Sequence, residues 1–74
     1  MKIGEALKSL RLHAGMTQTQ MAAGIVTESF YSKVERGVHA IDANTLIKIL
    51  TVHHFDVTKF FEQISNQQSN EPYL

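Results

Sequence analysis

The 74 residues of this chain are enough for one small domain and leave no room for separate catalytic and regulatory domains. Hydrophobic residues make up 43% of the chain, which suffices for one core, and the absence of cysteine excludes disulfides, zinc–thiolate sites and thiol nucleophiles. Seven lysines and arginines balance seven aspartates and glutamates, so the net charge of zero supplies no global field to attract a polyanion.

The chain carries no recognisable membrane or export signal. No apolar run approaches the roughly 18 residues needed to span a bilayer. The opening residues lack the apolar centre of a signal peptide, and Lys2 stands where N-myristoylation requires a glycine. We therefore expect a cytoplasmic protein without a membrane partner.

Apolar residues at helical spacing predict an all-α domain, beginning with two helices in the first third of the chain. A helix is expected up to Gly15, which suits a left-handed C-terminal cap. Its apolar face comprises Ile3, Ala6, Leu7, Leu10 and Ala14. A short helix, Gln18 to Ala23, follows. Thr17 and Gln20 have the spacing of a capping box at its start.

A third helix is predicted from Glu28 to Arg36. Thr27 is its candidate N-cap, and Gly37 stops it. Tyr31 and Val34 mark the side that faces the core. This arrangement leaves the polar N-terminal half of the helix free to face outward.

Two further helices and a polar tail complete the expected organisation. Asp42 caps a fourth helix, and Asp56 caps a fifth. The fourth carries two apolar stripes that place it centrally, formed by Ala43, Leu46, Ile47 and Leu50 and by Ile49 and Val52. One face of the fifth carries Val57, Phe60, Phe61 and Ile64. Polar composition from Ser65 onward predicts a domain over residues 1–64 and a linker or tail over 65–74.

Residues 18–23 and 28–36 have the arrangement of a helix-turn-helix, because two short helices are separated by a turn of three or four residues. Ala22 is small where the two helices must approach, and Val26 fills the turn. The second helix then projects its N-terminal polar residues, which a DNA major groove could receive.

Several motifs together resemble the phage-repressor and Cro family, also called XRE-type, over residues 3–64. They are Arg11, Gly15, Thr17-Gln18, Met21-Ala22 and the run from Ser32 to Gly37. The resemblance implies a compact five-helix, lambda-repressor-like fold with the helix-turn-helix at helices 2 and 3. It also implies a bacterial transcription regulator.

The turn is about one residue shorter than the family's usual pattern. The segment Ala22 to Val26, followed by Ser29-Phe30-Tyr31-Ser32-Lys33, is more similar to the Rgg-type regulators of Gram-positive bacteria. Full-length members of that group bind a signalling peptide, so such a peptide would act through a C-terminal domain absent from this chain. The chain would then be a truncated DNA-binding domain or a stand-alone relative.

The resemblance implies two kinds of DNA contact on this surface. The residues expected to face bases are Glu28, Ser29 and Lys33. The residues expected to face phosphates are Gln18, Thr27 and Arg36. Each has a structural alternative, such as helix capping for Thr27 or complementing the helix dipole for Glu28 and Arg36. Phe30 could meet a thymine methyl or sugar, or it could fold back on the domain.

The resemblance also pairs Arg11 with Glu35 in a salt bridge that joins the first helix to the recognition helix. Such a pair would fix the orientation of the recognition helix, and the arginine could also reach a phosphate.

The four histidines do not have the spacing of a metal site, since His13 and His39 are isolated and His53 and His54 are adjacent. The sequence also contains no nucleophile motif and no glycine-rich phosphate loop. We expect no enzymatic activity, no cofactor and no bound metal.

Charge is concentrated in the motif although the net charge is zero. Residues 1–40 hold five lysines and arginines against three acids, and the remainder holds two against four. The sequence therefore predicts a regulator that binds double-stranded DNA as a homodimer on a near-palindromic operator. The alternative is a protein-interaction module that uses the same helical scaffold without binding DNA, because fold alone does not decide function.

Overall fold

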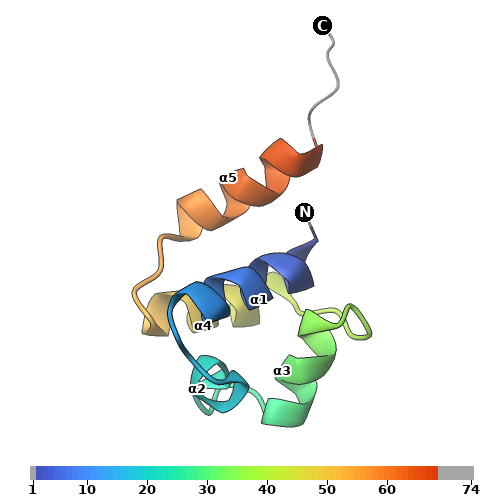
Figure 1. The fold of residues 1–74 in the computed structure, drawn as a ribbon, viewed down its shortest axis with the longest axis vertical. Helices are drawn as coiled ribbons and strands as arrows, with labels where there is room; N and C mark the ends of the chain where they lie inside the picture. Colours follow the sequence, from blue (N-terminus) through green and yellow to red (C-terminus); the bar gives the residue numbers. More distant parts are fainter. Residues whose placement is uncertain (1, 69–74) are drawn as a thin grey trace, which may run out of the picture.

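The computed structural model describes residues 2–68, with side chains described through Ser65, and this part of the chain folds into five helices without a strand (Figure 1). The helices are α1 (Ile3–His13), α2 (Gln18–Ala22), α3 (Glu28–Glu35), α4 (Ala43–Val52) and α5 (Val57–Gln68). The all-α prediction is confirmed. The predicted ends of α2 and α3 each lie one residue beyond the observed ends.

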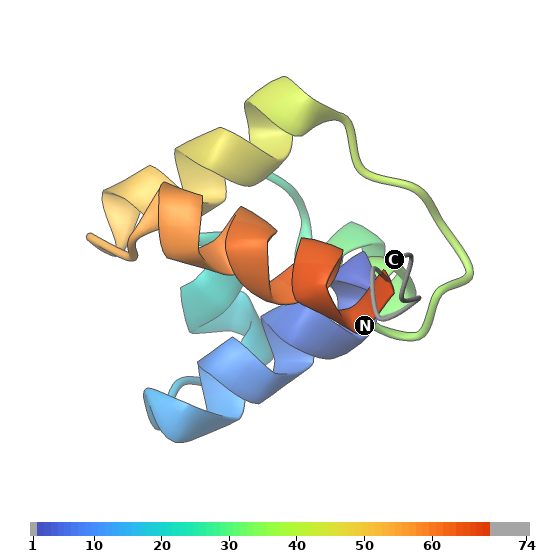
Figure 2. The same ribbon diagram turned by 90° about the horizontal axis from the view of Figure 1, so that it is seen from above.

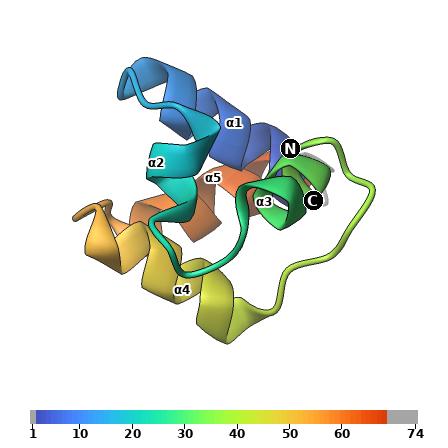
Figure 3. The same ribbon diagram turned by 90° about the horizontal axis from the view of Figure 1, so that it is seen from below.

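The helices form three levels around α1 and α4, which lie in the middle (Figure 1). α5 lies over α1 and α4 when the molecule is viewed from above, and it contacts both helices (Figure 2). α2 and α3 lie on the opposite side, nearest the viewer from below (Figure 3). α3 packs against both α1 and α2. The helix-turn-helix therefore faces away from α5.

All five helices contribute to a single core. Its buried side chains are Ala6, Leu7, Met21, Ala22, Tyr31, Val34, Leu46, Ile49, Leu50 and Phe60. The expected close approach at Ala22 is confirmed, since this residue is 2% exposed. Burying a Leu, Ile or Phe side chain contributes about 1.5–3 kcal/mol, so this cluster supplies the main stabilisation of a domain that has no disulfide.

Side chains cap the helices where the sequence predicts. Thr17 Oγ1 accepts from the Gln20 backbone N–H at 3.0 Å, and the Thr17 backbone N–H donates to Gln20 Oε1 at 2.9 Å. This is the predicted capping box. The three other caps each accept a backbone N–H at 3.0 Å and are made by Thr27, Asp42 and Asp56. These bonds fix the start of every helix from α2 to α5.

The outer part of the expected α4 stripe is exposed. Ile47 is 39% exposed and Val52 is 50% exposed, whereas the face that enters the core consists of Leu46, Ile49 and Leu50. Neighbouring helices cover only one side of α4, so apolar residues on its flanks remain at the surface. The prediction that Ile47 and Val52 face the core is wrong.

α5 continues to Gln68, past the end of its apolar stripe at Ile64. Glutamine is a good helix former, so a polar segment can continue the helix beyond its apolar stripe. The rest of the predicted tail, 69–74, lies outside the described residues.

Candidate nucleic-acid interface

One side of α3 presents polar side chains to solvent along most of the helix. Glu28, Ser29 and Lys33, the residues predicted to face bases, are all exposed. The opposite side of the helix is anchored by Tyr31 and Val34, which are 0% and 2% exposed. One side of α3 is therefore held by the core, and the other is accessible to a partner.

The turn between α2 and α3 begins with two left-handed residues. Ala23 has a φ of 55° and Gly24 a φ of 75°. Ile25 and Val26 then pack against the core as half-buried residues, as expected for Val26 in the turn. Thr27 follows in an extended conformation and caps α3. This short, packed turn sets the direction in which α3 leaves α2.

Arg11 and Glu35 form the ion pair that joins α1 to the end of α3. Arg11 Nε lies 2.7 Å from Glu35 Oε2, and Arg11 Nη2 lies 3.1 Å from Glu35 Oε1. Their side chains are only 12% and 3% exposed. Arg11 Nη1 also donates to the Met16 carbonyl at 3.1 Å. The guanidinium thus holds three segments together: α1, the turn after α1 and the last turn of α3.

Gln18 extends this network to α2. Its Nε2 donates to Glu35 Oε1 at 3.1 Å, an interaction that the sequence did not indicate. Burial alone would raise the pKa of Glu35, but hydrogen bonds from Arg11 and Gln18 hold this pKa below its ordinary value. Glu35 therefore carries its charge in a nearly enclosed position and accepts bonds from α1 and α2 together.

Tyr31 lies beside this network inside the core. Burial, together with the neighbouring Glu35 carboxylate, raises the pKa of the Tyr31 phenol far above its ordinary value. The hydroxyl has no hydrogen bond of standard geometry among the described residues. The phenol stays neutral, so the cluster around Glu35 contains one carboxylate and one guanidinium.

The other predicted contact residues on α3 have intramolecular partners. Arg36, exposed at the C-terminal end of the helix, donates from Nη1 to Ser32 Oγ at 2.6 Å. Phe30 is half-buried, and its ring centroid lies 5.0 Å from that of His39. The structure therefore places the Phe30 ring against the domain, which is one of the two positions that the sequence left open.

His53 makes a contact that sequence reasoning missed. Its Nε2 lies 3.1 Å from the Met21 carbonyl oxygen, which joins the end of α4 to α2. Carbonyls in the last turn of a helix lack helical partners. Because α2 has only five residues, the Met21 carbonyl needs a donor from elsewhere, and that need is the signal that could have suggested this contact.

No group of three potential metal-ligating side chains occurs among residues 2–65. No helix in the described part of the chain is long and apolar enough to cross a membrane.

These features define the class of the protein: a helix-turn-helix domain. The buried side of its second helix is held by the core and the Arg11–Glu35 ion pair, and the other side is exposed to solvent. The chain belongs to the Helix-turn-helix family, whose sequence profile matches residues 7–60. The predicted XRE-type resemblance is confirmed.

The chain is also similar to a solved structure, the crystal structure of a tyrosine-to-phenylalanine variant of the restriction-modification controller protein C.Esp1396I. The two share 25% sequence identity with a TM-score of 0.78, over 93% of this chain and 90% of the controller chain. No curated protein matches the sequence. Family and fold together identify a DNA-binding regulator of transcription.

Proposed function

We propose that this regulator reads DNA by inserting α3 into the major groove, with Glu28, Ser29 and Lys33 facing the base edges. The observation that carries the proposal is the division of α3 into a buried side that anchors it and an exposed polar side that includes all three residues. A lysine can donate a hydrogen bond to guanine, and a carboxylate can accept one from cytosine N4. This surface therefore offers both a donor and an acceptor to the base edges.

The phosphate contacts are proposed at the edges of the same surface. Thr27 is exposed at the N-terminus of α3, where backbone N–H groups favour an anion. Arg36 is exposed at the other end of α3. Gln18 uses one amide hydrogen on Glu35 and keeps a second for a phosphate. Contacts of this kind fix the register of the protein on the duplex without reading sequence.

We further propose that the protein binds as a homodimer. An excess of two positive charges over residues 1–40 supports only weak, salt-sensitive binding by one copy. Two copies on half-sites about one helical turn apart would give useful affinity on a near-palindromic operator. Phe61 is 36% exposed and belongs to α5, the helix on the opposite side of the molecule from α3 (Figure 1).

An Rgg-type assignment is a finer proposal within the same family. It is supported by the motif Ser29 to Lys33 and the compact turn before it. A signalling peptide would then bind a separate C-terminal domain. Fusing this chain to such a domain from an Rgg-type regulator tests the proposal, because operator binding by the fusion should respond to the peptide.

Selection from a random duplex library, followed by competition with every single-base variant of the selected site, tests the DNA-binding proposal. Lys33→Ala should cost about 1–3 kcal/mol on the selected site and relax preference at one base pair. Arg36→Ala is the matched control, because it removes a second exposed cation, at the C-cap of the same helix. Arg36→Ala should weaken binding to all the duplex variants equally. It should also lower, by about one, the slope of the logarithm of the binding constant against the logarithm of salt concentration.

Gln18→Ala is a poorer phosphate probe than Arg36→Ala. Gln18→Ala removes a bond to the buried Glu35 carboxylate, whereas Arg36→Ala removes only an exposed bond to the Ser32 hydroxyl. If Lys33→Ala weakened every variant equally, Lys33 would be a phosphate contact and the reading face would be wrong. Failure of the wild-type chain to shift any duplex at low salt would instead favour the protein-interaction module.

A further inference from the structure

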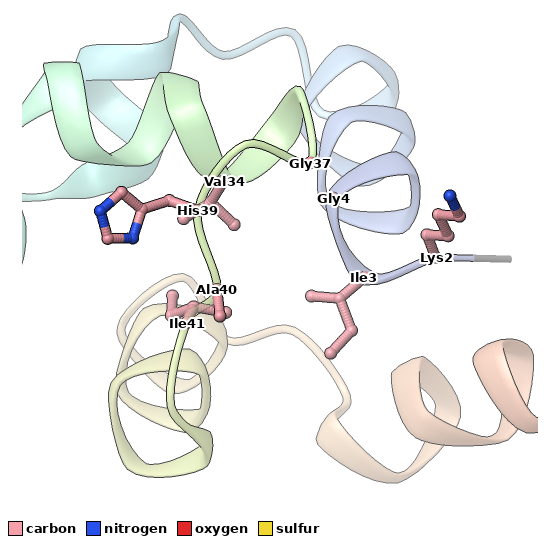
Figure 4. A pocket seen from close by; sticks show the side chains of 8 residues that line it. All are labelled: Lys2, Ile3, Gly4, Val34, Gly37, His39, Ala40 and Ile41. Atoms are coloured by element: carbon pink, nitrogen blue, oxygen red, sulfur yellow. The ribbon is translucent and has the colours of Figure 1, made fainter.

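Gly4 lies where the start of α1 meets the end of α3. It is buried in the first turn of α1, and the lining of the adjacent groove of about 200 Å³ includes Gly4, Val34 and Gly37 (Figure 4). A Cβ atom built on Gly4 would lie 2.8 Å from the Glu35 carbonyl oxygen and nearer still to that of Val34. The backbones of α1 and α3 therefore approach as closely as glycine permits.

Neither carbonyl can move away as a flexible side chain could. Both belong to the backbone at the end of α3, and the Val34 carbonyl also accepts from the Gly37 N–H at 3.1 Å. The Val34 side chain is buried in the core, and the Glu35 side chain is bound to Arg11. A methyl group at residue 4 would be too close to both carbonyl oxygens, so the backbone atoms would have to move apart. That movement can come only from displacing α1 and α3 relative to each other.

The role of Gly4 differs from that of the other glycines. Gly15, Gly24 and Gly37 all have positive φ angles, and a Cβ added to any of them would meet open space. Gly4 is helical, so the backbone does not require glycine there, and helix propensity would favour alanine. What requires glycine is the close approach of α3.

Helix dipoles favour the same contact. The N-terminal end of α1, which carries partial positive charge, meets the C-terminal end of α3, which carries partial negative charge. The attraction weakens as the helices separate. Gly4 allows the two ends to come closest where the end of α3 is also tied to Arg11.

We infer that Gly4 is a positioning residue that sets the spacing between α1 and α3 and thereby the placement of the recognition helix on DNA. The inference deepens the proposed function and rests on it for the DNA-binding role. Hydrogen bonds to bases weaken steeply with distance and angle, so displacement of α3 should reduce binding to the selected site. Non-specific attraction to phosphates depends far less on the placement of α3.

The test compares Gly4→Ala with Gly15→Ala, the same substitution at a site where the methyl group meets open space. Gly15→Ala strains a left-handed turn and lowers stability without pushing on α3. Both variants are also made in a His54→Gly background, which relieves an exposed non-glycine residue with a φ of 62°. Residual dipolar couplings of backbone amides report the orientation of α3 relative to α1 without DNA. Affinities are measured for the selected duplex and for a scrambled duplex of the same length.

We expect Gly4→Ala to reorient α3 and to lower the ratio of selected to scrambled affinity at least about tenfold. Binding of the scrambled duplex should stay within about twofold. Gly15→Ala should leave both the orientation of α3 and the ratio unchanged. The inference would be overturned if Gly4→Ala changed neither the orientation of α3 nor the ratio of selected to scrambled affinity. Failure of Gly4→Ala to fold in either background while Gly15→Ala folds would also overturn it, because Gly4 would then serve stability alone.

The two proposals fail in different ways. If wild type bound no duplex, the proposed function and the DNA-binding role of Gly4 would both be refuted. The couplings would still decide whether Gly4 sets the orientation of α3 relative to α1. If wild type bound DNA selectively and Gly4→Ala bound identically, only the inference about Gly4 would fail.

Discussion

Replacing Arg11 by alanine removes both charge-assisted hydrogen bonds that Glu35 receives from α1, at 2.7 and 3.1 Å. The Glu35 carboxylate, 3% exposed, would keep only its bond from Gln18. Removing one partner of a fully buried ion pair costs about 3–5 kcal/mol, whereas exposed pairs contribute about 0–1 kcal/mol. Because Arg11 is 12% exposed and water can enter its place, we expect Arg11→Ala to lower the free energy of unfolding by about 2–4 kcal/mol. A domain of this size has roughly 4–11 kcal/mol in total, so the loss is large.

A double-mutant cycle separates the pair from the packing of each side chain. Urea unfolding at pH 7, followed by far-UV circular dichroism, would be measured for Arg11→Ala, Glu35→Ala and the double variant. The coupling free energy should exceed about 1 kcal/mol, because the double variant leaves no uncompensated buried charge. Coupling below about 0.5 kcal/mol would show that the two side chains act independently, and would refute the role of the ion pair in holding α3 to α1.

The pH dependence gives the same pair a second test. The folded-state pKa of Glu35 lies below its ordinary value of 4.5, so its contribution to stability is present above about pH 4.5 and is lost as pH falls through the folded pKa. In Arg11→Ala, burial without the guanidinium should raise this pKa above the unfolded value. Protonation of Glu35 would then stabilise the variant. Urea midpoints from pH 3 to 7 should therefore show a smaller difference between wild type and variant at low pH.

Three further variants test other parts of the structure. Phe61→Glu should remain folded, become monomeric in analytical ultracentrifugation and lose cooperative binding to a duplex with two half-sites. An unchanged dimer would place the interface elsewhere, and loss of the fold would assign Phe61 to the core. His53→Ala should lower the free energy of unfolding by about 1–2 kcal/mol by leaving the Met21 carbonyl without its donor, and a change under about 0.3 kcal/mol in urea unfolding would exclude that role. Thr27→Ala should cost about 1 kcal/mol by removing the cap on the Phe30 N–H, and equal weakening on all duplexes would support a phosphate contact, whereas altered base preference would argue against one.

The sequence predicted the helices well because their signals are local. The capping box of Thr17 and Gln20 needs only a spacing of three residues, and the structure contains both of its bonds. Burial on α4 was less predictable. Ile47 lies only a quarter-turn from the buried Leu46, and its exposure depends on how far neighbouring helices extend. Periodicity identifies an apolar sector of a helix but not which edge of that sector is covered.

The candidate site was predictable only in part, for a related reason. The pairing of Arg11 with Glu35 came from family resemblance, not from a local pattern. The bond from Gln18 to Glu35 spans 17 residues, and that from His53 to the Met21 carbonyl spans 32. Long-range contacts between polar groups leave no periodic signal, since each residue also has an ordinary role on its own helix.

Glu35 shows why stability and recognition are coupled at one end of α3 and separable at the other. Its carboxylate is held by Arg11 from α1 and by Gln18 from α2, while its backbone carbonyl abuts Gly4. A substitution there should therefore change both the free energy of unfolding and the placement of the helix. Ser29, in the exposed half of α3, has neither tie, so its replacement can alter contact with a base while the fold stays intact. If α3 reads the operator as proposed, variation in operator preference should be least constrained in the N-terminal half of α3, because the last turn of the helix already fixes its position.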